Sequence, residues 1–173
     1  MSRLVSTVPG AFAAFYSLLA AAGQAQNPPI SVFAQALQQD EPNSYVLLGG
    51  SPDGQPGIRN HSFEPASLGS LNQYETFELW GYATAYLGSF DPASALADTW
   101  SLYQDVVMAT FVNYSGGNGS LGGPGSAILG ASAPATLERM LPECADYTGV
   151  PTGSGFAGVV EFCYSFKSRI TVA

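Results

Sequence analysis

The chain has 173 residues, of which only 10% are charged, and five Lys or Arg against 13 Asp or Glu give a net charge of −8. This length suits one domain, so we expect residues 1–173 to form a single domain. Five scattered basic residues are too few for the phosphate-neutralising surface of a specific DNA- or RNA-binding protein. The 46% hydrophobic and 12% aromatic content argues against a disordered chain.

The N-terminal segment predicts an amphipathic helix. Pro9 suits the first turn of such a helix, where its missing N–H is harmless. We expect this helix to be retained rather than cleaved as a signal peptide, because the segment carries one positive charge and Pro9 interrupts it early. No run reaches 18 apolar residues, so we expect no membrane-spanning segment. The apolar face of the helix recurs at steps of four, three and four: Val8, Phe12, Phe15 and Leu19.

Short strands are predicted at 30–34, 45–48 and 58–64. The last of these lies in a segment rich in Gly and Pro, 51–70, which we expect to be an extended hairpin or a long arm. A long strand follows at 74–87, with Phe77, Leu79 and Ala83 on one face and aromatic and polar residues on the other.

A second helix is predicted to begin with Asp91 as N-cap and Pro92 as its first residue. The low-complexity segment 115–133 that follows it predicts a long Gly-rich loop. The apolar residues of the helix recur at steps of three and four, and we expect them to pack on the sheet: Leu96, Trp100, Tyr103, Val107, Phe111 and Tyr114.

Two strands are predicted to close the chain, at 135–150 and 156–172, joined by a turn at 149–155. Pro142 makes the first of them an edge or bulged strand. The order of elements favours an α+β fold: a mostly antiparallel β-sheet with two α-helices packed on one face, and long Gly/Pro-rich loops. The residues expected in the core are Phe77, Leu79, Trp100, Tyr103, Val107, Phe162, Tyr164 and Phe166.

No constellation of residues predicts an enzyme, and we expect no catalytic, cofactor-binding or metal-binding residue. His61 is the only histidine and is expected to be an exposed loop residue. Glu75 and Glu78 are three apart on a strand, so they point to opposite faces and are expected to be solvated or interfacial charges. The Gly-rich run lacks the Gly-Lys-Ser/Thr ending of a phosphate loop.

Trp80, Tyr82 and Tyr86 form an aromatic row. Proteins that bind single-stranded nucleic acid stack bases on such rows within a positively charged groove, but here Glu75 and Glu78 lie beside the row. We favour a sheet face that a helix or a neighbouring subunit covers.

The two cysteines, Cys144 and Cys163, leave a second interpretation open. They would pair in a secreted protein and would be small buried side chains in a cytoplasmic one. Three Asn-x-Ser triplets, at Asn60, Asn113 and Asn118, would suit glycosylation of a secreted protein. The alternative function is therefore a secreted, disulfide-bonded binding protein.

The order of the expected helices, strands and loops along the chain resembles that of the tail terminator proteins of long-tailed phages (siphophages), especially those of actinobacterial hosts. The resemblance rests on the N-terminal helix, the strand Tyr-Val-Leu-Leu-Gly-Gly at 45–50 and the strand Tyr-Glu-Thr-Phe-Glu-Leu-Trp-Gly at 74–81. The second helix, the flexible loop and the final strand ending in Lys-Ser-Arg-Ile at 167–170 complete it.

This resemblance implies a virion structural protein without catalytic residues, assembled in the host cytoplasm. It implies a homohexameric ring at the head-tail junction that caps the tail tube, stops tube polymerisation and joins the head-closure (stopper) protein. The partners would be other copies of the chain, the tail tube protein and the head-closure protein, with DNA passing non-specifically through the lumen. Another ring of the neck or tail, the stopper or the major tail protein, is the alternative within the particle.

Overall fold

The structure, a computed structural model, describes residues 6–34, 42–66, 72–110 and 135–170. Its framework is one sheet with the strand order β1-β2-β4-β6-β5, and β3 pairs with β4 as well. All pairs are antiparallel except β1 with β2. The strands among the described residues are β1 (Ser31–Phe33), β2 (Ser44–Leu48), β3 (Ile58–Pro65), β4 (Gln73–Leu87), β5 (Ala135–Thr152) and β6 (Gly155–Ile170).

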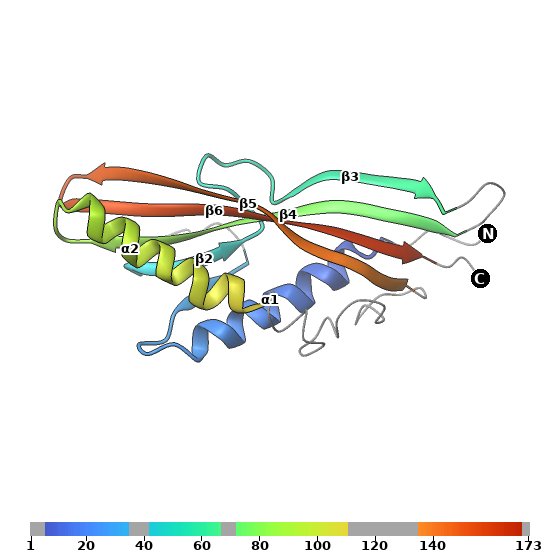
Figure 1. Ribbon diagram of the computed structural model, residues 1–173, viewed down its shortest axis with the longest axis horizontal. Coiled ribbons are helices and arrows are strands. Elements are labelled where there is room, and N and C mark those ends of the chain that lie inside the picture. The colour runs from blue at the N-terminus through green and yellow to red at the C-terminus, as the bar shows by residue number, and fades with distance from the viewer. Residues whose placement is uncertain (1–5, 35–41, 67–71, 111–134, 171–173) are drawn as a thin grey trace.

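The central strand β4 has a different partner along each half of one edge. β2 pairs with residues 81–85 and β3 with residues 73–79, while β6 pairs along the whole opposite edge. The segment 49–57 between β2 and β3 lies on the side of the sheet away from the helices (Figure 1). Residues 58–65 of the segment 51–70 form β3, the first strand of a hairpin with β4, and residues 67–70 of the segment lie outside the described part.

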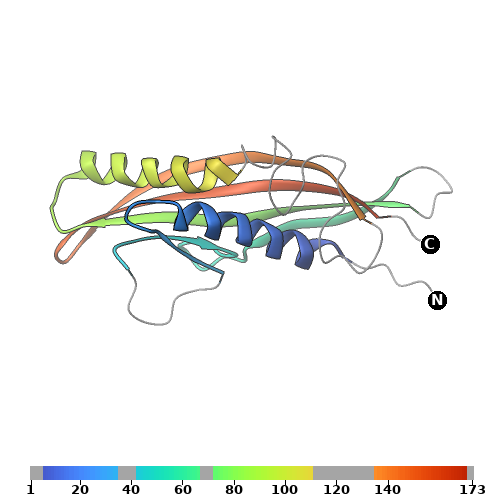
Figure 2. The ribbon, with the colours of Figure 1, turned by 90° about the horizontal axis from the view of Figure 1, so that it is seen from below.

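Two helices lie on one face of the sheet, as Figures 1 and 2 show: α1 (Val8–Gln24) and α2 (Pro92–Leu102). Asp91 caps α2 as predicted, because its side chain accepts a hydrogen bond from the Ala93 N–H. α2 continues as a π-helix, η1 (Tyr103–Met108). The α+β fold with two helices on one face of a mostly antiparallel sheet is thus confirmed.

Aromatic rings fill the space between the helices and the sheet. Phe15 of α1 packs on Tyr164 and Phe166, with ring centroids 5.0 and 6.0 Å apart, and Phe77 stacks on Phe166 at 5.0 Å. Burying each such side chain contributes about 1.5–3 kcal/mol. Seven of the eight residues expected in the core are buried: Phe77, Leu79, Tyr103, Val107, Phe162, Tyr164 and Phe166.

Trp100 is the exception, and the predicted apolar face of α2 is wrong in its first part. Trp100 is half-buried and Leu96 is 43% exposed, whereas the buried residues of α2 are Ala95, Thr99 and Leu102. Phe111 and Tyr114 of the predicted face lie outside the described residues.

The cause of this difference is a close approach of α2 to β6 at Gly158. A Cβ there would lie 2.1 Å from Thr99 Oγ1 and 2.8 Å from the Ala95 carbonyl oxygen. Only small side chains fit on the helix side of that contact. Tyr103 and Val107 follow Thr99 by four and eight residues and continue its buried face into η1, whereas Trp100 packs at the edge of the core.

The final hairpin is tighter than predicted. Thr152 pairs with Gly155, so the turn consists of Gly153 and Ser154 rather than residues 149–155. β5 is an edge strand with a register shift between Pro142 and Cys144, as the proline predicts. The predicted loop at 115–133 lies outside the described residues. None of the helices described here is long and apolar enough to span a membrane.

Candidate functional surfaces

Glu75 is a buried carboxylate that joins three elements. Its side chain has no exposed surface, although it stands on the apolar face of β4. Ser6 Oγ donates to Oε1 at 2.5 Å, and Thr7 donates to Oε2 from its backbone N–H at 2.6 Å and its hydroxyl at 2.5 Å. His61 Nε2 on β3 lies 2.8 Å from Oε1. Glu75 thereby ties the start of α1 and the strand β3 to the centre of the sheet.

This arrangement corrects two predictions. Glu75 and Glu78 do lie on opposite faces, but Glu75 is buried instead of solvated. His61 lies in β3 rather than in a loop, and its ring is 38% exposed and held by Glu75.

The hydrogen bonds around Glu75 give it a structural role. Ser6 and His61 both contact the carboxylate, so it stands between the hydroxyl and the imidazole. A hydrolytic triad needs the imidazole against the hydroxyl instead. The negative charge lies at the N-terminus of α1, where it interacts favourably with the helix dipole.

The pKa of the Glu75 carboxyl group depends on the balance between burial and hydrogen bonding. Burial alone would raise the pKa of Glu75, but the hydrogen bonds from Ser6, Thr7 and His61 outweigh burial and hold its pKa below the ordinary value of 4.5. The carboxylate is therefore ionised at neutral pH and stabilises the folded chain there.

The sheet face away from the helices carries the aromatic row. Trp80, Tyr82 and Tyr86 are half-buried there, and no helix described in the structure covers them. The Arg59 guanidinium lies 4.0 Å from the centre of the Trp80 ring, and the indole N–H donates to Glu78 at 2.9 Å. An arginine already occupies one face of this ring, which disfavours base stacking on it.

Beside this row lies an acidic hollow of about 360 Å³ between the segment 49–57 and β5 and β6. Asp53, Asp146 and Glu161 line it, and Arg59 pairs with Glu161 at 3.5 Å. Partial burial raises the pKa of Glu161; Arg59 opposes this shift, and Asp53 and Asp146 add to it. No group of three or more His, Cys, Asp or Glu in the described residues is arranged to hold a metal ion.

The outer face of α2 is the second surface of note. It forms a shallow apolar hollow of about 480 Å³ whose lining includes Leu96, Ala97 and Trp100. Asp98 and Asp105 are exposed on the same helical segment, towards α1. Sequence reasoning missed this surface because it placed Leu96 and Trp100 against the sheet.

The two cysteines lie opposite each other in the backbone register of β5 and β6. Cys163 is buried, and the side chain of Cys144 lies outside the described part of the structure. A bridge between them stays a prediction, and so do the predictions of no catalytic residue, no cofactor and no metal.

Comparisons with known proteins place the fold. No family model matches the sequence, and no curated protein matches it. Among solved structures, a chain in the virion of a native gene transfer agent (GTA) particle is similar, with a TM-score of 0.53 over 95% of this chain and 97% of that chain. The two chains share a fold. Their sequences are 12% identical.

Proposed function

We propose that this protein is a non-enzymatic structural component of a virion, and that it is the tail terminator of a long-tailed phage or phage-like particle. The observation that carries the proposal is the fold shared with a chain of the gene transfer agent virion along nearly the whole length of both chains. The order of elements, which resembles that of tail terminator proteins of phages of actinobacterial hosts, supports the specific role.

In this role the chain forms a homohexameric ring at the head-tail junction. The ring ends polymerisation of the tail tube, contacts the tail tube protein on one side and joins the head-closure protein on the other. DNA passes through its lumen. The net charge of −8 supports this last point, since an acidic wall repels DNA and lets it slide.

Cryo-electron microscopy of the intact particle tests the position. A single six-fold ring of this chain between the neck and the first tube ring is the expected result. Density repeated along the tail would make the chain the major tail protein, and a ring on the head side would make it the stopper.

Particles produced without the chain provide an independent measurement. They should contain tubes of irregular length that fail to join heads, because nothing ends tube growth. Absence of the chain from purified particles would contradict the proposal. Together with a Cys144–Cys163 bridge and glycans on Asn60, Asn113 or Asn118 in mass spectrometry, it would favour a secreted binding protein.

A further inference from the structure

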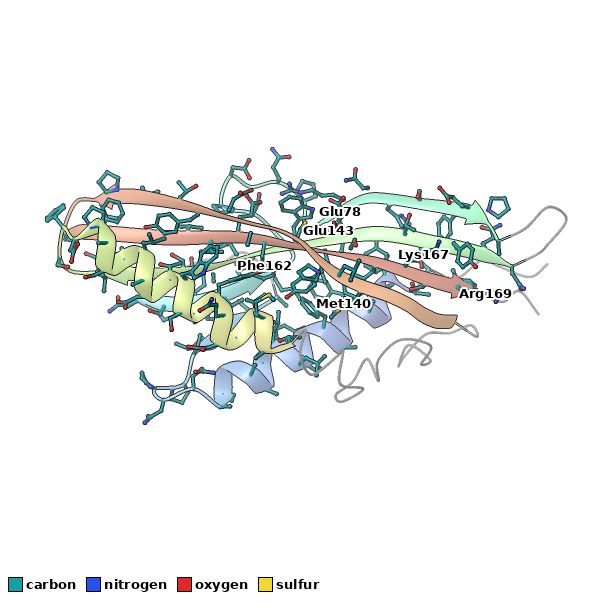
Figure 3. The ribbon with its side chains drawn as sticks, in the orientation of Figure 1. Glu78, Met140, Glu143, Phe162, Lys167 and Arg169 are labelled. Carbon is teal, nitrogen blue, oxygen red and sulfur yellow. The ribbon has the colours of Figure 1, made fainter. Side chains whose placement is uncertain are left out.

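Two aspartates and two basic residues lie towards opposite ends of the molecule. α2 lies over the half of the sheet that contains the β5–β6 hairpin (Figure 1). Asp98 of α2 and Asp105 of η1 are exposed on the side of this helical segment that faces α1. Lys167 and Arg169 lie towards the other end of β6, as Figure 3 shows. In the described part of the chain, none of these four side chains has an ion-pair partner within 4.0 Å.

The basic end lies on the opposite face of the sheet from α2. Residues 168 and 170 of β6 are buried towards the helices, so Lys167 and Arg169 alternate onto the other face. Lys167 Nζ lies 4.2 Å from the centre of the Tyr74 ring on β4, and Leu141 on β5 is 37% exposed on the same face. Glu64 on β3 is exposed opposite Tyr74, so this end combines two cations and one carboxylate with apolar side chains.

α2 presents the complementary combination. Leu96 is 43% exposed and Trp100 is half-buried in the apolar hollow. Ser101 lines both this hollow and the neighbouring one that contains the two exposed aspartates. A half-buried tryptophan in an apolar hollow is typical of the residues that dominate binding at protein interfaces.

We propose that the outer face of α2 docks on the Lys167–Arg169 end of the sheet in the next copy of this chain. The face of α2 and the Lys167–Arg169 end differ from each other and lie at opposite ends and on opposite faces of the molecule. Each copy can therefore contact one neighbour through α2 and another through the Lys167–Arg169 end, which is a head-to-tail arrangement. Head-to-tail contacts close into rings when the rotation between copies permits. This inference rests on the proposed ring and names the surfaces that build it.

Charge reversal tests the contact, with self-association measured by sedimentation equilibrium at low ionic strength. Asp98→Lys with Asp105→Lys, or Lys167→Glu with Arg169→Glu, should each weaken self-association at least about tenfold, because like charges then face each other. An equimolar mixture of the two double variants should restore association, since every contact between unlike copies again pairs opposite charges. Circular dichroism confirms that each variant folds.

Asp53→Lys with Asp146→Lys is the matched control. This control changes the net charge of the chain by the same amount as Asp98→Lys with Asp105→Lys. Its two positions lie away from both proposed surfaces, so it should associate like the wild type. Leu96→Ser tests the apolar part separately, because this exposed side chain is dispensable for the core, and it should also weaken association.

Two results would overturn the contact: a wild-type chain that stays monomeric at every concentration, or variants that associate like the wild type with no gain on mixing. The second result would assign the face of α2 to a different protein of the particle. Neither would remove the proposed function, which depends on where the chain lies in the virion.

Discussion

Replacing Glu75 by Gln removes a charge from the most connected buried carboxylate of the described chain while keeping the size of the side chain. The amide retains one acceptor oxygen, so at least one of the hydrogen-bonding groups of Ser6, Thr7 and His61 then faces an NH₂ group. Hydrogen bonds to a charged group contribute about 1.5–3 kcal/mol each, and an unsatisfied buried donor costs about 1–3 kcal/mol. We expect Glu75→Gln to lower the free energy of unfolding by about 2–4 kcal/mol.

Urea unfolding at neutral pH, followed by tryptophan fluorescence and far-UV circular dichroism, measures this loss. Glu78→Gln is the matched control on the same strand. Glu78 lies on the opposite face and accepts hydrogen bonds from Asn60 and Trp80 at a half-exposed position, so its loss should stay below about 1 kcal/mol. Equal losses for the two variants would refute the role given to the buried network.

The pH dependence supplies a second check on the same carboxylate. Because the pKa of Glu75 in the folded chain lies below its ordinary value of 4.5, its stabilisation is complete above that pH and disappears as the pH falls through the folded-state pKa. The difference in unfolding free energy between wild type and Glu75→Gln should therefore shrink below pH 4.5. A difference that stays constant into that range would show that the charge of Glu75 contributes nothing.

Two further substitutions test how α2 packs, both by thermal and urea unfolding. Gly158→Ala should cost about 1–3 kcal/mol, because the new Cβ would overlap Thr99, whereas Gly88→Ala, with open space around it, should cost less than about 0.5 kcal/mol. Trp100→Ala should cost about 1–2 kcal/mol, less than the roughly 3–5 kcal/mol of the fully buried Phe162→Ala. A loss at Trp100 as large as that at Phe162 would place Trp100 in the core after all.

The long strand β4 was predictable because it follows the simple alternation of a sheet with one covered face. In β4 the odd-numbered positions from 75 to 85 are buried and the even ones half-buried, which the sequence shows as apolar against polar and aromatic residues. Pro142 likewise predicts the irregular edge strand, because proline lacks the N–H that a central strand needs.

The face of α2 was not predictable from periodicity. Spacing identifies the largest apolar side chains, Leu96 and Trp100, whereas the contact with Gly158 selects the small Ala95 and Thr99. Nothing in a helical pattern shows that the opposing strand approaches so closely, or that a π-helical turn will follow.

The sequence gives only a weak indication that Glu75 is buried, because Glu75 lies on the same strand face as Phe77 and Leu79. What the sequence does not show is the set of donors that permits a buried charge. Ser6 and Thr7 precede Glu75 by 69 and 68 residues, so only the fold brings them to it.

The outer edge of β5 has a consequence for how copies of this chain can join. A long strand with one free edge invites the backbone of another chain to extend the sheet. In β5, Pro142 and Pro151 offer no N–H, and two register shifts interrupt the regular row of donors and acceptors. Continuous backbone pairing between copies along this edge is thereby disfavoured. Contacts that another molecule makes with β5 are left to side chains, whose charges respond to salt and can be exchanged one at a time.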